Sequence, residues 1–571
     1  MDDEKNVRES RKNSDAEIEK LFSKITDENV RELRKKYNKI RRWVIADFLR
    51  RNARKFPEKT ALIFNHPDGY EIKLSYEELD REANKLANAL LNFGLKKYDR
   101  VAILAHNTPH HVITIFGSAK AGVIYLGLNY LLYGKDLAYA INHSESKILI
   151  VEDSLYPRIE PIVGDLKNVK LFLWSNQGSN MPTPKGWISL DNFYKQVDGS
   201  EPNTILNIEE PVQMTYTSGT ESLPKAVIHT NESLISHYVG TIIDGEYKSN
   251  DILLNVMPIY HCAQRDVFLM PIFYVGGTNI LLKEPDINSI LEYTNKYKPT
   301  MLFLAPTVWI NILRHPKIDE YDLSSLRKCY YGASIFPEEP LKEIMKKLPQ
   351  ARFYNYYGQT ELAPYHTVAN HDEILSCPRT AGRTGLNLES RLEDDSNNEI
   401  KEINVPGEIV AKGPHVMLEY FKNPEKTEEA FEGGWFHSGD VAIMHKWGNF
   451  EIVDRKKDMI KTGGENVSSR EVEECIYRHP DILEAAVIGL PHEKWIEAVT
   501  ALVVPKAGKS IEPKDIIDLC KKELSPFKVP KGVIVIKPEE LPKSPSGKIL
   551  KRQLRERFKD FYLNENNQPG K

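Results

Sequence analysis

The sequence predicts an α/β protein with a large N-terminal domain of layered sheets and helices, a β-rich subdomain and a small α+β C-terminal domain. From about 60 to 310, apolar strand segments alternate with amphipathic helix segments, which is typical of buried, largely parallel sheets. Near 400 the chain changes to short alternating segments separated by Gly and Pro turns. After about 457 a compact unit of helices and strands follows.

Individual segments support this prediction. Residues 100–106, 147–153, 251–258 and 300–306 are short apolar runs that we expect to be core strands. Residues 75–94 form an amphipathic pattern that starts at a serine and stops at a glycine, as helices do. The most apolar stretch, 112–133, contains Lys120 and three glycines, so a buried helix followed by a core strand is expected rather than a membrane span.

We divide the chain into a large domain, 1–456, and a small domain, 457–571. Residues 1–45 read as a charged helical extension of the large domain. The basic run 34–42 inside it is interpreted as a solvated helix face, and an anionic partner surface is the alternative.

Composition excludes several classes of protein. The formal net charge is −4 over 571 residues, so no global basic excess points to nucleic acid. The five cysteines form no CxxC pair, which argues against a disulfide scaffold or a zinc site and favours a reducing cytoplasm. The N-terminus lacks the apolar core of a secretory signal. Whether the protein is a homodimer is left open.

The segment YTSGTESLPK, residues 216–225, is the sharpest local feature. Its hydroxyls, loop amides and lysine are groups that bind phosphate oxygens. It is not a Walker A loop, which requires GxxxxGK followed by Ser or Thr. Taken alone, such a turn before a lysine is also found in ordinary loops.

The order of further motifs resolves this ambiguity, because the chain resembles the adenylate-forming superfamily over roughly residues 45–557. That superfamily includes acyl-CoA synthetases, firefly luciferase and peptide-synthetase adenylation domains. The segments that carry the resemblance occur in the family's order: YTSGTESLPK (216–225), YGASIFP (331–337), YYGQTE (356–361), PGEIVAKGPHVMLEYFKNPEKT (406–427), GWFHSGD (434–440), DRKKDMIKTGGENVSSREVE (454–473) and PKSPSGKILKRQLR (542–555).

The resemblance implies an ATP site and its chemistry. Glu361 would carry Mg²⁺, a hard ion that prefers carboxylate and phosphate oxygens. Asp440 would accept the ribose hydroxyls, and Tyr357 would lie against adenine. The full set of expected ATP-binding residues is Thr217, Ser218, Gly219, Thr220, Lys225, Gly332, Ala333, Ser334, Tyr356, Tyr357, Gly358, Gln359, Thr360, Asp440, Arg455 and Lys548.

Three residues are expected to act in catalysis. Lys548 resembles the mobile lysine that offsets charge when a carboxylate attacks the α-phosphate. Thr217 belongs to the phosphate loop, and Lys461 corresponds to a residue near the second-step site.

In this family the small domain rotates between two half reactions, so the resemblance implies a mobile C-terminal domain. The hinge would lie at Lys457, and coenzyme A would pass along Gly463, Gly464 and Glu465. A plain hairpin turn is the alternative explanation of the two glycines.

His261, Gly332 and Gly358 are the expected acyl-pocket residues. Acetate-selective members of the family carry a tryptophan at the position of Gly358, so its glycine argues against strict acetate specificity. His261 would orient the carboxylate or only pack. The polar cluster 264–266 would face a polar acyl tail or form a salt-bridged helix start, and the second reading is favoured slightly.

The chain also departs from the family pattern. Glu221 and Ser222 replace a Thr-Gly pair in the phosphate loop, and Ala226 replaces its last glycine. Ile496 replaces the glycine of a usual Gly-Glu pair. These changes affect the details of phosphate binding and do not alter the expected reaction class.

The sequence therefore predicts an AMP-forming acyl-CoA ligase that uses ATP, Mg²⁺ and coenzyme A. The acid is expected to be aliphatic and larger than acetate. The alternatives are an aryl-CoA ligase, a stand-alone adenylation enzyme that loads a carrier protein, and a non-catalytic protein that keeps the fold. Retention of Glu361, Asp440, Arg455 and Lys548 argues against the last alternative.

Overall fold

The computed structural model describes residues 42–571 except 180, 218–223, 335, 544–548 and 564–571. The helical extension expected over 1–45 therefore lies almost wholly outside the described residues, as does most of the basic run 34–42. Within the described part of the chain, no helix is long and apolar enough to cross a membrane.

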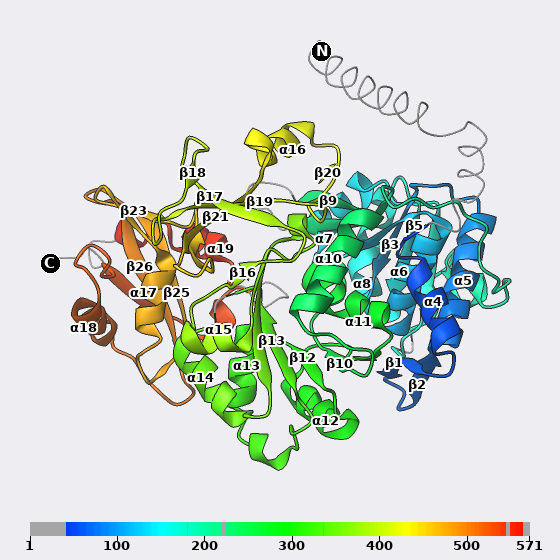
Figure 1. Cartoon of the computed structure of the whole chain (residues 1–571), viewed down its shortest axis with the longest axis horizontal. Helices are drawn as coiled ribbons and strands as arrows, with labels where there is room; N and C mark the ends of the chain where they lie inside the picture. Colours follow the sequence, from blue (N-terminus) through cyan, green and yellow to red (C-terminus); the bar gives the residue numbers. More distant parts are fainter. Residues whose placement is uncertain (1–41, 180, 218–223, 335, 544–548, 564–571) are drawn as a thin grey trace, which may run out of the picture.

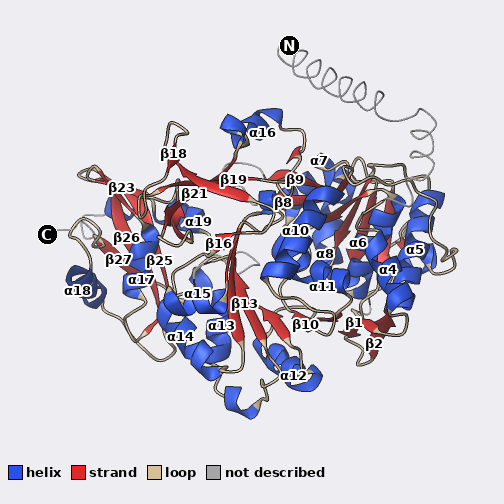
Figure 2. Cartoon of the chain, viewed as in Figure 1, coloured by secondary structure: helices blue, strands red, loops and turns tan. Residues whose placement is uncertain are grey.

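The large domain is built on two extended sheets, as the alternating pattern predicts (Figures 1 and 2). The first contains, in spatial order, β16 (Arg383–Thr384), β15 (Thr367–Ala369), β14 (Arg352–Tyr357), β13 (Lys328–Gly332), β12 (Met301–Phe303), β10 (Ile252–Asn255), β11 (Thr278–Leu281), β1 (Thr60–Asn65) and β2 (Glu71–Ser75). The second contains β20 (Glu419–Tyr420), β9 (Lys225–Thr230), β8 (Pro211–Thr217), β4 (Ile124–Gly127), β3 (Arg100–Leu104), β5 (Ile148–Glu152), β6 (Leu171–Ser175) and β7 (Ile188–Ser189).

Helices pack against these sheets. The helices of the large domain include α4 (Asp47–Lys55), α5 (Tyr76–Asn92), α6 (Pro109–Ala121), α10 (Asn231–Asp244), α11 (Met270–Val275) and α14 (Glu338–Lys347). The remaining ones are α7 (Gly134–His143), α8 (Tyr156–Ile159), α9 (Leu190–Tyr194), α12 (Ile287–Tyr297), α13 (Pro306–Leu313), α15 (His371–Ser376) and α16 (Pro424–Ala430).

One hydrophobic core joins both large sheets. It combines Phe64 of β1, Ile103 of β3, Leu86 of α5 and Phe116 of α6, so helices share a core with strands of each sheet. Because the apolar side chains of both sheets are covered, their strands read as continuous apolar runs in the sequence.

Helix α5 begins and ends where the sequence predicts. The Ser75 hydroxyl accepts a hydrogen bond from the Glu78 backbone N–H (3.2 Å), and the Ser75 N–H donates to the Glu78 carboxylate (2.8 Å). This capping box satisfies amides that the first turn leaves unpaired. The chain leaves the helix through Gly94, whose φ of 97° suits glycine.

The apolar stretch 112–133 contains most of α6 and the whole of strand β4, which confirms the prediction of a buried helix and core strand. Lys120 is buried, and its ammonium lies 2.9 Å from the carboxylates of Asp80 and Glu201. A buried ammonium needs such partners.

The β-rich subdomain is a five-stranded antiparallel sheet. Its order is β18 (Glu399–Ile400), β17 (Glu389–Glu393), β19 (Gly407–Lys412), β21 (Phe436–Met444) and β22 (Phe450–Arg455). It leads directly into the small domain.

The small domain has its own sheet and cores (orange to red in Figure 1). Its strands are β24 (Glu465–Val467), β23 (Ile460–Thr462), β26 (Ile496–Pro505) and β25 (Ile482–His492), with β27 (Gly532–Val535) paired to β26. Its helices are α17 (Ser469–Ile476), α18 (Pro513–Glu523) and α19 (Lys551–Phe558). This is the α+β unit that the sequence predicts.

Candidate active site

Strands β8 and β9 form the hairpin that carries the expected phosphate loop. Thr217 ends β8 and pairs in register with Lys225, which begins β9. The Thr217 hydroxyl lies 3.4 Å from the Lys225 backbone oxygen, to which it donates. The loop between them, with Ser218, Gly219, Thr220 and the unusual Glu221 and Ser222, lies outside the described residues.

The Lys225 ammonium and the Glu361 carboxylate are joined through Tyr420. The ammonium lies 4.1 Å from the centre of the Tyr420 ring, and the Tyr420 hydroxyl donates to Glu361 Oε1 at 2.7 Å. Burial and the Glu361 charge both raise the pKa of Tyr420, so the phenol keeps its proton and remains a donor. The Lys225 ammonium and the Glu361 carboxylate thus both contact Tyr420. A cation close to a metal-binding carboxylate suits the binding of a metal-bound phosphate chain.

Glu361 fits the metal role expected of it. It is buried, and Mg²⁺ is held by one or two carboxylates together with substrate phosphates. A single well-placed carboxylate is therefore sufficient as the protein's ligand. Among the residues that the structure describes, no group of three or more metal-ligating side chains forms a preformed cage.

Thr360 is held by two neighbours from other segments. Its hydroxyl lies 3.3 Å from the Cys262 sulfur, and its backbone oxygen lies 2.7 Å from His229 Nε2. Burial raises the pKa of the Cys262 thiol to about 12, so the thiol is protonated at neutral pH. These contacts fix the short 3₁₀ turn Thr360–Leu362 in which Thr360 and Glu361 lie.

A second cluster forms beside the first, around Asp440. The Tyr357 hydroxyl donates to Asp440 Oδ2 at 2.7 Å, and Arg455 Nε lies 3.3 Å from Asp440 Oδ1. Burial disfavours the Arg455 charge, but Asp440, Asp458 and Glu361 together with Tyr357 outweigh burial and hold the pKa of Arg455 above its usual value. Gln359 joins the same region because its amide donates to the Ser438 backbone oxygen at 3.3 Å.

Strand register explains how these residues meet. Tyr356, Tyr357 and the residues after them leave the end of β14, and Gly332 at the end of β13 pairs with Tyr356. Asp440 and Arg455 face one another across β21 and β22. Ala333 and Ser334 follow Gly332, and Ala333 takes a φ of 64°.

Gly332 and Gly358 are required by the backbone around them. A Cβ at Gly332 would lie 2.4 Å from the Tyr356 backbone oxygen, and a Cβ at Gly358 would lie 1.9 Å from the Pro364 backbone oxygen. Any side chain would therefore displace the main chain. Because close packing explains both glycines, neither one measures the length of an acyl pocket.

His261 and the polar cluster beside it make different contacts. The Ala263 backbone N–H donates to His261 Nδ1 at 3.2 Å, at the start of a π-helix, Ala263–Leu269. Inside that helix, the side chains of Arg265 and Asp266 are fully buried and paired at 2.9 Å. The salt-bridged helix start is therefore confirmed for the polar cluster.

The remaining contacts of this ion pair are also internal. Arg265 donates to the Tyr260 backbone oxygen at 2.8 Å and to the Thr215 hydroxyl at 2.9 Å. Asp266 accepts hydrogen bonds from Gln213 and Tyr238. These partners occupy the charged groups, which argues against a polar acyl tail as their ligand.

The residues expected to contact coenzyme A lie on the β23–β24 hairpin of the small domain. Gly463 and Gly464 have φ of 60° and 90°, which a tight hairpin turn with two left-handed residues demands. The turn is held by the Gly463 N–H, which donates to the Trp495 backbone oxygen at 3.0 Å, and by the Lys461 N–H, which donates to Glu497 at 2.8 Å. Glu465 follows on β24.

The two domains meet next to Lys457. The Asp454 carboxylate accepts hydrogen bonds from the Ser469 N–H at 2.7 Å and its hydroxyl at 2.6 Å. Arg379 of the large domain lies 3.2 Å from the Glu474 carboxylate of α17. The catalytic lysine expected at 548 lies outside the described residues.

Sequence reasoning missed Tyr420, Cys262 and His229, which all touch the site. Tyr420 falls in the motif segment 406–427, and Cys262 lies between His261 and the polar cluster 264–266, but their roles could not be predicted from these positions. The roles depend on β20 pairing with β9 and on the π-helix start approaching Thr360, and both are tertiary contacts.

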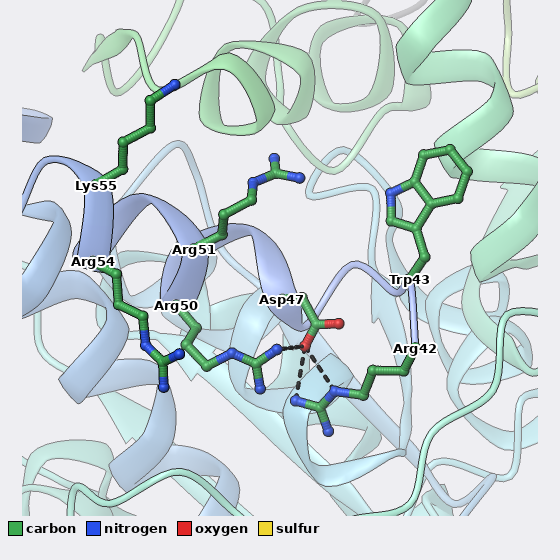
Figure 3. Close-up of a pocket in the computed structure, with 7 residues that line it drawn as sticks. All are labelled: Arg42, Trp43, Asp47, Arg50, Arg51, Arg54 and Lys55. Carbon is green, nitrogen blue, oxygen red and sulfur yellow. Dashed lines mark hydrogen bonds and ion pairs between the residues drawn. The ribbon is translucent and has the colours of Figure 1, made fainter. Parts of the chain in front are cut away.

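A cavity of about 490 Å³ lies elsewhere, along α4 (Figure 3). Most of the arginines that line it form ion pairs or hydrogen bonds with other residues. Arg42, the described end of the basic run 34–42, pairs with Asp47 at 2.7 Å and Glu201 at 2.9 Å, and Arg51 donates to the Tyr274 backbone oxygen. The Arg42 side chain is thus buried and paired and does not belong to a solvated helix face. The residues that line this cavity are not those of the site on β8, β9 and β14.

Comparison with known proteins gives a consistent result. The sequence profile of the AMP-binding enzymes matches residues 49–421, and that of the AMP-binding enzyme C-terminal domain matches 471–548. A feruloyl-CoA synthase of Amycolatopsis sp is 32% identical over 508 residues, 89% of this chain and 98% of that protein.

Two further relatives extend the comparison. A long-chain-fatty-acid–CoA ligase of Bacillus subtilis (strain 168) is 31% identical over 534 residues, 88% of this chain and 93% of that protein. The crystal structure of ATP-bound MatB from Rhodopseudomonas palustris aligns with a TM-score of 0.80 and 28% identity, covering 90% of this chain and 99% of that one.

Proposed function

The chain belongs to the AMP-binding enzyme family and is an AMP-forming acyl-CoA synthetase, and from this premise we propose that its acid is aliphatic and larger than acetate. ATP and coenzyme A are its cosubstrates, and Mg²⁺ accompanies ATP. The five free cysteines suit a reducing compartment, so we also propose the cytoplasm as its location.

The observation that carries the proposed mechanism is the convergence of two clusters on residues 356–361. Lys225, Tyr420 and Glu361 form the first, and Tyr357, Asp440 and Arg455 form the second. The first offers a cation and a metal-binding carboxylate to a phosphate chain. The second offers a carboxylate acceptor to two vicinal ribose hydroxyls and a ring to adenine.

In the first half reaction, an oxygen of the substrate carboxylate attacks the α-phosphorus of ATP. The bond to the bridging oxygen breaks, and pyrophosphate leaves. Negative charge gathers around the α-phosphate, so the chain must supply cations and donors that are already in place. We assign this role to Thr217, Lys225, Thr360 and Lys548, and Glu361 would hold the Mg²⁺ that supplies further positive charge to the phosphates.

In the second half reaction, the thiol of coenzyme A loses its proton to solvent and attacks the acyl carbonyl carbon, and AMP leaves. We propose that the small domain turns about Lys457 to bring the β23–β24 hairpin to the site. Gly463, Gly464 and Glu465 would then line the path of the thiol arm, with Lys461 beside it.

The size of the acid is argued from the relatives, because backbone packing explains Gly332 and Gly358. Their names specify a feruloyl and a long-chain fatty acyl group, both larger than acetyl. An aryl acid is the second candidate, since the feruloyl-CoA synthase is 32% identical.

A pyrophosphate-exchange screen over carboxylic acids tests the proposal. The acids are short to long alkyl chains and a matched series of aryl acids, and AMP release is measured with and without coenzyme A. We expect exchange with alkyl acids above two carbons and AMP release that depends on coenzyme A. Best exchange with aryl acids would replace the aliphatic assignment. Exchange without that dependence would favour transfer to a carrier protein, and no exchange with any acid would refute the activity.

A further inference from the structure

Two buried histidines, His237 and His415, lie together without hydrogen-bond partners. His237 is on α10, and His415 lies between β19 and β20. Their ring centres are 5.9 Å apart, and both side chains are fully buried. Within the described part of the chain, neither ring nitrogen of either histidine has a hydrogen-bond partner.

Two buried imidazoles without hydrogen-bond partners destabilise the folded protein unless a polar group binds to them. Buried polar groups in native proteins are almost always hydrogen-bonded, because a buried group without a partner has lost its hydrogen bonds to water and gained none in return. The other two buried histidines nearby each have at least one partner, although His366 Nδ1 has none among the described residues. His229 contacts the Thr360 backbone oxygen at 2.7 Å and Ser233 at 3.2 Å, and His366 contacts Ser390 at 3.0 Å. The His237–His415 pair is therefore unusual in its own surroundings.

The pair is attached to the catalytic segment. The centre of the Tyr365 ring lies 5.7 Å from that of each of the two imidazoles. The Tyr365 backbone N–H donates to the Leu362 backbone oxygen. Met417, two residues after His415, donates its N–H to the Glu361 backbone oxygen at 2.7 Å. The two imidazoles thus flank the chain immediately beyond Thr360 and Glu361, where the substrate carboxylate reacts.

The chemistry of the pair selects a neutral partner. Burial lowers the pKa of His415 to about 3 and that of His237 well below its usual value. Both imidazoles are therefore neutral near pH 7, and each offers one N–H donor and one acceptor nitrogen. A hydroxyl group also donates once and accepts, so it matches two neutral imidazoles. A carboxylate only accepts, and it would be buried without a countercharge.

Thr241 lies one turn after His237 on α10 and adds a hydroxyl to the same face of the helix. Its hydroxyl is buried and, among the described residues, has no partner. Residues four apart on a helix share a face, so Thr241 lies on the side of α10 that carries His237. The Tyr356 hydroxyl donates to the Thr241 backbone oxygen at 3.3 Å, which ties this face to β14.

We propose that His237 and His415 form a subsite that binds a hydroxyl group on the acyl chain of the substrate, so that the preferred acid is a hydroxy acid. The proposal rests on the proposed acyl-CoA ligase function and names the class of its acid. A site built to hydrogen-bond a hydroxyl rejects an analogue that lacks it, because its own buried groups then stay unpaired.

The test compares straight-chain acids of four to eight carbons with their terminally hydroxylated counterparts by pyrophosphate exchange. For the best chain length, we expect kcat/KM to favour the hydroxy acid by about 100-fold or more. His237→Leu and His415→Leu should each reduce that preference at least about tenfold. His111→Leu on α6 is the matched control, because it removes a buried imidazole whose two nitrogens both have partners. We expect it to leave the preference unchanged.

A second measurement does not depend on the variants folding. Non-reactive acyl-sulfamoyl adenosines with and without the hydroxyl are bound to the unaltered protein, and their Kd values should differ by at least about tenfold in favour of the hydroxylated one. Exchange with alkyl and hydroxy acids at rates within about threefold at every length would overturn the subsite and assign the pair to bound water. No exchange with any acid would instead refute the activity itself.

Discussion

At the scale of single residues, Ile496 has an unfavourable backbone conformation. Ile496 adopts φ of 67°, a left-handed conformation that β-branched residues avoid, and the residue is 70% exposed. It stands where the family usually has glycine, so the departure noted in the sequence has a physical cost. The residue pairs with Thr462 beside the β23–β24 hairpin.

Replacing Ile496 by glycine should stabilise the protein. Relief of left-handed strain is worth about 1–2 kcal/mol, and the greater freedom of glycine in the unfolded chain removes part of it, so we expect a net gain of about 1 kcal/mol. Urea unfolding of the small domain measures it. Val535→Gly, an exposed β-branched strand residue with ordinary φ, is the control and should destabilise by about 0.5–1 kcal/mol. Equal losses in both variants would contradict the explanation.

The Tyr357 hydroxyl positions Asp440 for the nucleotide. Tyr357→Phe removes a 2.7 Å hydrogen bond to a carboxylate, a type worth about 1.5–3 kcal/mol, so we expect the KM for ATP to rise about tenfold or more. The KM for the acid should stay within about twofold. Tyr354→Phe, which removes a hydroxyl near Arg352 on the same strand, is the control. A rise that is equal for ATP and acid would show a general loss of structure instead.

At the scale of elements, the π-helix Ala263–Leu269 is organised around a charge pair. Arg265 and Asp266 are fully buried, and their partners come from β8, α10 and the segment before the helix. Removing one member of such a pair leaves an uncompensated buried charge.

Arg265→Met should therefore destabilise the protein by about 3–5 kcal/mol, measured by urea unfolding. The matched substitution Lys342→Met breaks an exposed pair with Glu338 on α14 and should change stability by less than about 1 kcal/mol. Similar losses in the two variants would show that the buried pair has no special role.

Glu152 connects the two large sheets. It ends β5 of the second sheet, and it lies 3.0 Å from His106 Nδ1 and 2.9 Å from the ammonium of Lys283, which follows β11 of the first sheet. Burial alone would raise the pKa of Glu152, but the hydrogen bond and charge of His106, together with Lys283, lower it to about 2.

The pH dependence follows from that lowered pKa. The Glu152 contribution is present above its ordinary pKa of 4.5 and is lost as the pH falls from there towards about 2. Glu152→Gln should therefore cost most stability at pH 7, and the difference from the unaltered protein should shrink between pH 4.5 and 3. Urea unfolding across this range measures it, with exposed Glu160→Gln as control. A difference that is constant with pH would be contrary to this expectation.

Element by element, most of the fold could be predicted from the sequence, because local periodicity and caps determine it. Strands β3, β5, β10 and β12 and helix α5 lie where the sequence places them. The salt-bridged helix start at 264–266 was predicted, but its π-helical form and its buried partners such as Gln213 and Tyr238 were not, since these partners are distant in the chain. The role of Tyr420 could not be predicted for the same reason, because its contacts with Lys225 and Glu361 form only when β20 pairs with β9.

At the scale of the whole molecule, the contact between the two domains includes a partly exposed ion pair. Arg379 and Glu474 form an ion pair across it, and the Arg379 side chain is 45% exposed. The Glu474 side chain is 18% exposed, so the pair is intermediate between a surface pair, which contributes about 0–1 kcal/mol, and a buried one. Asp454 and Ser469 meet close to Lys457, where a rotation moves atoms least. The contact thus supports the proposal that the small domain turns about Lys457.

The central claim is one site used twice, with Lys548 needed only for adenylation, and the half reactions of Lys548→Ala test it most directly. Pyrophosphate exchange measures the first step, and thioester formation from a supplied acyl-adenylate and coenzyme A measures the second. We predict that exchange falls at least about 100-fold while thioester formation stays within about threefold, because the ammonium offsets charge only in the first transition state. Equal loss of both steps would contradict the account.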